Sequence, residues 1–141
     1  MSRTGHPPND DAPQVVAEWL NLLTEDLDWD DKGRAYLLLT ETLHALRDYL
    51  TIKEAADLAA QLPLIFKGIW FNGWNPSAVP SYPRDKRAFL HRVSAKFTAE
   101  PLEDAERAVI AVFDLLRRQV SHGELEHVRK SMRSSLQDLW T

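Results

Sequence analysis

The sequence predicts an all-α protein, a bundle of about seven or eight helices built from two tandem, pseudo-symmetric helical units. Three observations predict this fold class. Apolar residues recur at three- and four-residue intervals along most of the 141-residue chain. No stretch alternates apolar and polar residues in the way that a half-buried strand does. Finally, the two halves of the chain align without a gap when one is shifted by 70 positions.

The internal alignment is clearest at positions where helix packing and capping restrict the residue type. Identical residues coincide in several pairs: Leu20 and Leu90, Ala35 and Ala105, Arg47 and Arg117, Glu54 and Glu124, and Trp70 and Trp140. We therefore expect a duplicated helical block whose two copies bury equivalent faces around their tryptophans. The chain would divide into a disordered tail (1–13), a first unit (14–70), a connecting loop (71–83) and a second unit (84–141), packed as one compact domain.

The first two helices of the first unit follow from two apolar stripes. Residues 15–27 carry the first stripe and residues 35–50 carry the second. Between them lies the run Asp-Trp-Asp-Asp at 28–31, whose short acidic side chains suit the start of a helix and its positive dipole end. The second helix is therefore expected to begin directly after this run.

Two further helix starts in the first unit have local signals. Thr51 and Glu54 have the spacing of a capping box, in which each side chain accepts a hydrogen bond from the other residue's backbone N–H. Pro63 has no N–H and would clash with a preceding helical turn. It therefore predicts the start of a last short helix over residues 64–70.

The second unit repeats this plan. Its first helix is expected around residues 89–97 and its second over residues 105–120, with Pro101 near the start of the second. Ser121 and Glu124 form a second potential capping box. The last apolar stripe runs over residues 125–139 without a proline, so the last two helices are expected to form one continuous helix to about residue 140.

Composition excludes several classes of protein. The chain has no cysteine, so it can form neither disulfides nor thiolate metal sites. It has no apolar run of about 18 residues that could span a bilayer, and its first 13 residues lack the pattern of a secretory signal or transit peptide. These features lead us to expect a cytoplasmic protein without membrane contact.

The connecting loop contains three prolines, one glycine and three aromatic residues. Proline and glycine are typical of an ordered loop rather than a continued helix. The aromatic side chains would either lie back on the helices and seal the seam between the units, or stay partly exposed as anchors for a partner. Five residues form the candidate partner-binding surface: Trp74, Tyr82, Arg84, Lys86 and Arg87.

Several short motifs around this loop are typical of a known protein family. They are Leu62-Pro63, Gly68-Ile69-Trp70, Gly73-Trp74-Asn75-Pro76, Pro80 and Phe89-Leu90-His91-Arg92-Val93. Together with residues 55–63, they resemble the bacterial family called domain of unknown function 2267, for which Gly-Trp-x-Pro is the most specific motif. The second half departs from the family at Met132-Arg133, where a Leu-Pro pair would be expected. The resemblance implies a small cytoplasmic bacterial helical protein and implies no activity.

Motifs that carry chemistry are sparse. The sequence has no Gly-x-Ser-x-Gly elbow and no Gly-rich phosphate loop, so we expect neither an enzyme nor a bound cofactor. Glu-x-x-His occurs twice, at Glu41 with His44 and at Glu124 with His127. Because such pairs on facing helices hold di-metal sites, these four residues are the alternative hypothesis of a metal- or small-ligand-binding bundle.

Charge is distributed unevenly. Residues 1–83 carry a formal net charge of −6 and residues 84–141 one of +2, which together give the −4 of the whole chain. The basic residues would form an ordinary solvated helix face, bind an acidic partner, or support self-association in which the acidic unit of one copy meets the basic unit of another. Nucleic-acid binding through the basic unit is a third hypothesis, weakened by the negative net charge. The leading hypothesis is a non-enzymatic protein-interaction or regulatory module with an unknown protein partner.

Overall fold

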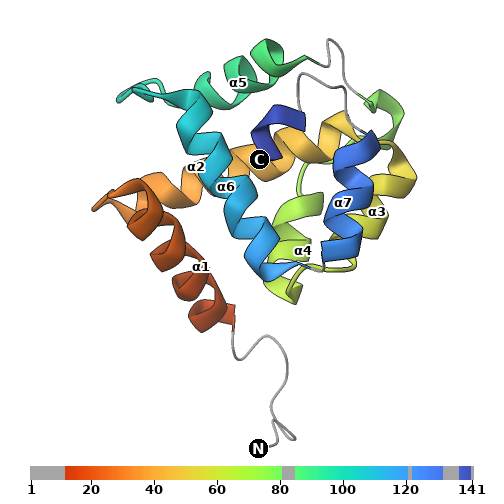
Figure 1. Cartoon of the computed structure of the whole chain (residues 1–141), viewed down its shortest axis with the longest axis horizontal. Coiled ribbons are helices and arrows are strands. Elements are labelled where there is room, and N and C mark those ends of the chain that lie inside the picture. The colour runs from red at the N-terminus through yellow and green to blue at the C-terminus, as the bar shows by residue number, and fades with distance from the viewer. Residues whose placement is uncertain (1–11, 81–84, 121, 132–136, 141) are drawn as a thin grey trace, which may run out of the picture.

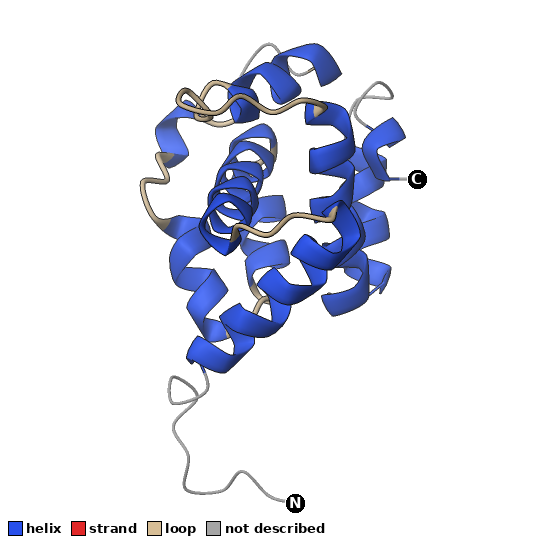
Figure 2. Cartoon of the chain, turned by 90° about the vertical axis from the view of Figure 1, so that its left-hand side faces the viewer, coloured by secondary structure: helices blue, strands red, loops and turns tan. Residues whose placement is uncertain are grey.

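The computed structural model describes residues 12–80, 85–120, 122–131 and 137–140, and within these ranges it is built from helices and loops with no strand (Figures 1 and 2). The predicted all-α class is confirmed. The helices in chain order are α1 (Ala12–Leu27), α2 (Lys32–Tyr49), α3 (Ile52–Ala59), α4 (Leu64–Phe71), the 3-10 turn η2 (Pro76–Ala78), α5 (Lys86–Ser94), α6 (Ala105–Gln119), α7 (His122–Ser131) and the 3-10 turn η3 (Asp138–Trp140).

The core is centred on α2 and α6, which cross each other in the middle of the molecule (Figure 1). Both helices bury large apolar side chains completely, among them Leu39 and Leu43 on α2 and Val112 and Phe113 on α6. Helix α1 packs against both α2 and α6, and so does α5. The two halves of the chain therefore share one hydrophobic core. Among the described helices, none combines the length and the apolar character needed to cross a membrane.

The helix starts in the first half of the chain agree with their sequence signals. Asp31 caps α2 by accepting a hydrogen bond from the Arg34 backbone N–H at 3.1 Å. Thr51 and Glu54 form the expected capping box at the start of α3. Pro63 occupies the N-cap position of α4, as its missing N–H predicts.

Other boundaries differ from the sequence-based expectation. Helix α1 begins at Ala12, two residues before the expected start of the first unit. Helix α6, in contrast, begins at Ala105 as expected; Asp104 is its N-cap and accepts from the Arg107 backbone N–H at 3.0 Å, and Pro101 lies three residues before this cap. An aspartate oxygen can satisfy one of the free N–H groups of the first turn, which a proline ring cannot do. Ser121 and the junction between the last two helices (132–136) lie outside the described residues.

Arg47 of α2 organises a buried polar network and is only 3% exposed. Its Nη1 donates to the carbonyl oxygens of Trp70 and Asn72, both at 2.8 Å, at the end of α4. Its Nε lies 2.7 Å from Asp48 Oδ1, and Arg92 of α5 reaches the other Asp48 oxygen at 2.6 Å. The network ties α2, α4 and α5 together.

One pair of contacts coincides with the proposed internal duplication. Arg117 donates to the carbonyl oxygen of Trp140, as Arg47 does to that of Trp70, and both arginine–tryptophan pairs are related by 70 positions. Trp70 also donates its Nε1–H to the Ala55 carbonyl at 3.1 Å, and the Trp140 ring stacks on Phe113 with centroids 4.2 Å apart. One shared pair of contacts does not establish that the two units superpose, so the two-unit pseudo-symmetry stays a prediction.

Candidate functional site

Trp74, the central residue of the predicted partner-binding surface, is half-buried and packs against the hydrophobic core. Its ring lies 5.2 Å, centroid to centroid, from that of Phe71, the last residue of α4. Its Nε1–H is buried and has no hydrogen-bond acceptor in the described structure. Trp74 therefore behaves partly as a seal over the core, with Phe71 as the more exposed ring of the pair.

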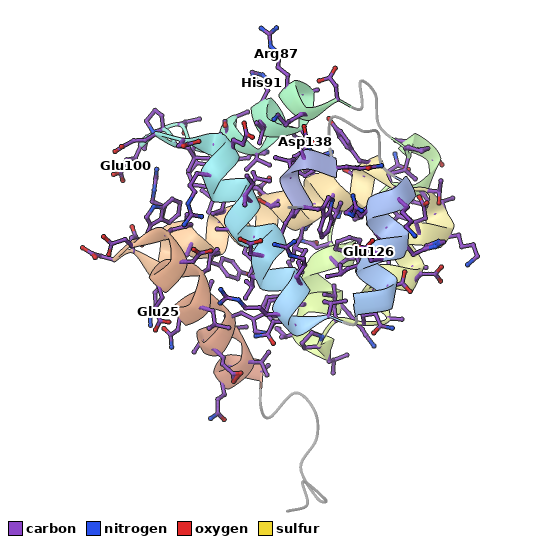
Figure 3. All side chains as sticks on the ribbon, viewed as in Figure 1. Glu25, Arg87, His91, Glu100, Glu126 and Asp138 are labelled. Atoms are coloured by element: carbon purple, nitrogen blue, oxygen red, sulfur yellow. The ribbon has the colours of Figure 1, made fainter. Side chains whose placement is uncertain are left out.

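The charged residues of the predicted partner-binding surface differ in their contacts. Lys86 Nζ lies 3.0 Å from Glu106 Oε2, so it ties the first turn of α5 to α6. Arg87 is exposed and, like His91 one turn later, projects away from the body of the molecule (Figure 3). Tyr82 and Arg84 lie outside the described residues. The role of this surface in partner binding stays a prediction.

The residues of the alternative metal hypothesis lie on α2 and α7. His44 Nε2 lies 2.6 Å from the Ile69 carbonyl oxygen, which can only accept, so this nitrogen carries the proton and is not a free metal ligand. Glu41 is one turn earlier on α2, and Glu124 and His127 are on α7. Within the ranges that the structure describes, no group of three or more His, Cys, Asp or Glu residues could hold a metal ion.

A hollow lies elsewhere, between the α1–α2 connection and the α5–α6 connection. Figure 1 shows these two connections at its left-hand side. The hollow has a volume of about 600 Å³, and we refer to it as the acidic groove. Its lining residues are Leu27, Asp28, Trp29, Asp30, Asp31, Arg34, Glu100, Pro101, Leu102, Glu103, Asp104, Arg107 and Ala108. The two connections are far apart in the sequence and meet only in the folded protein.

Arg34 links the two walls of the groove. Its Nη1 donates to the Glu100 carbonyl oxygen at 2.7 Å and its Nη2 to that of Pro101 at 3.1 Å. The guanidinium carbon lies 5.0 Å from the centroid of the Trp29 ring and 5.1 Å from that of Phe97. Both distances are within the range of a cation–π contact, so the guanidinium plane is held by aromatic faces as well as by hydrogen bonds.

Arg107, in the first turn of α6, makes a second link, which reaches back to the last turn of α1. Its Nη2 donates to both the carbonyl oxygen and the Oδ1 of Asp26, each at 2.8 Å. Arg34 and Arg107 each stand three residues after the aspartate that caps their helix, Asp31 or Asp104. The two capping aspartates are 73 rather than 70 positions apart, so the internal alignment does not pair them, and the same Asp-x-x-Arg spacing also occurs within α6 at Asp114 and Arg117.

The groove has a negative formal charge, since six carboxylates and two guanidinium groups line it. Several of these groups are already engaged: Asp31 and Asp104 cap helices, and Glu100 lies 3.8 Å from Arg34. Asp30 and Glu103 are exposed and make no ion pair with another described residue. These two free carboxylates give the groove a surface that suits a cationic ligand.

Comparison with known proteins gives one family. A search of the curated proteins finds no match to this chain. The family described as "Uncharacterized conserved protein (DUF2267)" matches residues 16–139, which include every helix from α2 to α7 and all residues of the acidic groove. Because the match covers most of the 141 residues, the chain belongs to the DUF2267 family.

Proposed function

We propose that this protein is a cytoplasmic, non-enzymatic protein-interaction module that binds a positively charged segment of a partner protein in the acidic groove. One observation carries this proposal: a hollow of about 600 Å³ in which a half-buried tryptophan, Trp29, is surrounded by carboxylates. An aromatic anchor within a pocket is typical of residues that dominate binding energy at interfaces. The surrounding negative charge would attract and orient a basic segment.

The state of the individual carboxylates supports a cationic partner. Asp30 and Glu103 stand on opposite walls of the groove, and neither is neutralised by an ion pair within the described structure. A lysine or arginine side chain between them would gain two carboxylate neighbours, while the Trp29 face is already occupied by Arg34. Arg34 bonds to the α5–α6 connection and Arg107 bonds to Asp26 in the last turn of α1, so the two walls are already held together and little ordering is needed on binding.

The acidic groove is better formed than the surface around Trp74. Trp74 packs on the core, as Trp29 does, but Lys86 is already paired with Glu106, which leaves Arg87 as the exposed charge described there. An interface that includes Phe71, Trp74 and Arg87 remains a secondary candidate within the same functional class.

Peptide binding tests the proposed function. Short unstructured peptides that differ only in carrying arginine, lysine or glutamine at fixed positions are titrated against the wild-type protein and the double variant Asp30→Asn/Glu103→Gln. The wild type is expected to bind the basic peptides and not the glutamine peptide. If each carboxylate contributes about 0.7 kcal/mol, the double variant weakens binding about tenfold.

A matched control separates the groove from overall charge. Glu18→Gln/Glu25→Gln removes the same number of charges from exposed positions on α1 that do not line the groove. It is expected to bind nearly as tightly as the wild type at physiological salt, because screening limits the range of exposed charges. No binding of any basic peptide, or equal weakening by both double variants, would contradict the proposal.

A further inference from the structure

We infer that Arg34 is a positioning residue that closes one end of the acidic groove and so limits which ligands the groove accepts. This inference rests on the proposed function, because it concerns the shape of the same site. Arg34 extends from the first turn of α2 to a segment 66 and 67 residues further along the chain, where it holds the carbonyl oxygens of Glu100 and Pro101. These two hydrogen bonds set the distance between the groove walls at this point.

The side chain is held in one orientation. The Trp29 and Phe97 rings both lie about 5 Å from its guanidinium carbon, and its side chain is only 17% exposed. A planar guanidinium can stack on aromatic rings and donate two separate hydrogen bonds at the same time. An ammonium group would keep the charge but could not reproduce the planar stacking and the forked donation together.

The position of Arg34 gives it a second effect. A smaller hollow of about 290 Å³ is lined by Phe97, Thr98 and neighbouring residues. Asp31, Arg34 and Glu100 line both this hollow and the acidic groove. The Arg34 side chain and its bond to Glu100 therefore belong to the partition between the two hollows. Shortening the side chain would join them into one longer trough.

This geometry has consequences for a bound peptide. In the wild type, the ligand chain has to end or turn away where Arg34 bridges the walls. The positive charge of Arg34 also repels a ligand cation from that end of the groove, so the cation is directed toward Asp30 and Glu103. Arg34 would act through shape and repulsion, without itself binding the partner.

Two readouts test Arg34, one of which needs no ligand. The first is amide hydrogen exchange over residues 98–104 in the wild type, Arg34→Ala, Arg34→Lys and the control Arg118→Ala, an exposed arginine of α6 that lines neither hollow. Loss of the two bonds is expected to speed exchange about tenfold in Arg34→Ala and less in Arg34→Lys, with Arg118→Ala unchanged. Unchanged exchange in both Arg34 variants would overturn the inference.

The second readout compares a short basic peptide with the same peptide extended by a few apolar residues. The wild type is expected to bind both equally, and Arg34→Ala to bind the extended peptide several-fold more tightly because its trough is longer. Arg34→Lys keeps a long cationic side chain and should restore most of the wild-type preference. An Arg34→Ala protein that binds both peptides equally would overturn the gating role. Failure of every peptide to bind the wild type would instead refute the proposed function, and the exchange experiment would still decide whether Arg34 fixes the groove walls.

Discussion

Two arginines, Arg47 and Arg34, make similar hydrogen bonds but differ in burial and in their distance from a carboxylate. Each donates to two backbone carbonyl oxygens of a distant segment: Arg47 to Trp70 and Asn72, and Arg34 to Glu100 and Pro101. Arg47 is buried and has the Asp48 carboxylate at 2.7 Å. Arg34 lies at the rim, and its nearest carboxylate contact, to Glu100, is at 3.8 Å.

This difference implies two roles: Arg47 supports the stability of the fold, and Arg34 supports the shape of the acidic groove. Around Arg47, the hydrogen bond to the Trp70 carbonyl is buried and water cannot replace the lost donor there, so this bond supports the fold itself. Around Arg34, the accepting carbonyls belong to exposed residues that water can reach when the side chain is removed. Removing Arg47 should therefore destabilise the whole protein, whereas removing Arg34 should mainly change one surface.

The largest expected effect is that of Arg47→Ala. The variant leaves the Trp70 and Asn72 carbonyls without these bonds and removes one of the two cations beside Asp48. Breaking a buried ion pair from one side costs about 3 kcal/mol or more in the free energy of unfolding. Chemical denaturation measures this loss. The free energy of unfolding of Arg118→Ala, on the exposed surface of α6, should stay within about 0.5 kcal/mol of the wild-type value. A similarly small loss for Arg47→Ala would contradict the structural role given to Arg47.

The pH dependence of the free energy of unfolding tests the contribution of Asp48 to the buried network. Burial raises the pKa of this carboxyl, but hydrogen bonds from Arg47 and Arg92 outweigh burial, so the pKa lies below its ordinary value of 3.8. A carboxyl with a lowered folded-state pKa contributes stability above its unfolded-state pKa and loses it as the pH falls through the folded-state value.

The expected result is that wild type and Asp48→Asn differ most in the free energy of unfolding near neutral pH. The difference should shrink as the pH falls below 3.8, where Asp48 becomes protonated in the wild type too. Denaturation of both proteins across this range measures the change. A difference that stays constant with pH would show that the Asp48 charge does not support the network.

The smallest expected effect on stability is that of Arg34→Ala. It removes two hydrogen bonds at a partly exposed position, which costs about 1 kcal/mol, because water can hydrate the freed carbonyls. Thermal unfolding of Arg34→Ala and Arg47→Ala under the same conditions gives the ratio of the two losses in stability. Equal losses for the two variants would show that the groove rim is as important to folding as the interior.

Local signals in the sequence predicted much of the fold. Asp31, Thr51 and Pro63 each mark the start of a helix because capping depends on residues only a few positions apart. The predicted start of the second helix of the second unit at residue 105 agrees with α6, although the cap of this helix is Asp104 and Pro101 lies three residues before it.

The acidic groove could not be predicted in the same way. Trp29 and Glu103 line one groove only because α1 and α5 both pack on the α2–α6 core, which brings their following connections to one side of the molecule. The sequence shows that Arg34 is present at the start of α2, but not that it reaches Glu100. The half-burial of Trp74 depends equally on tertiary packing, so the alternatives of seal and anchor could not be separated beforehand.

The most direct test of the central claim is chemical-shift mapping of the wild-type protein titrated with a basic peptide. We expect the largest backbone amide shifts within residues 27–34 and 100–108. The indole N–H signal of Trp29, assigned by its loss in Trp29→Phe, should move with them. Shifts concentrated instead at Phe71, Trp74 and Arg87, with the groove residues unchanged, would contradict the claim and place the interaction surface at the α4–α5 connection.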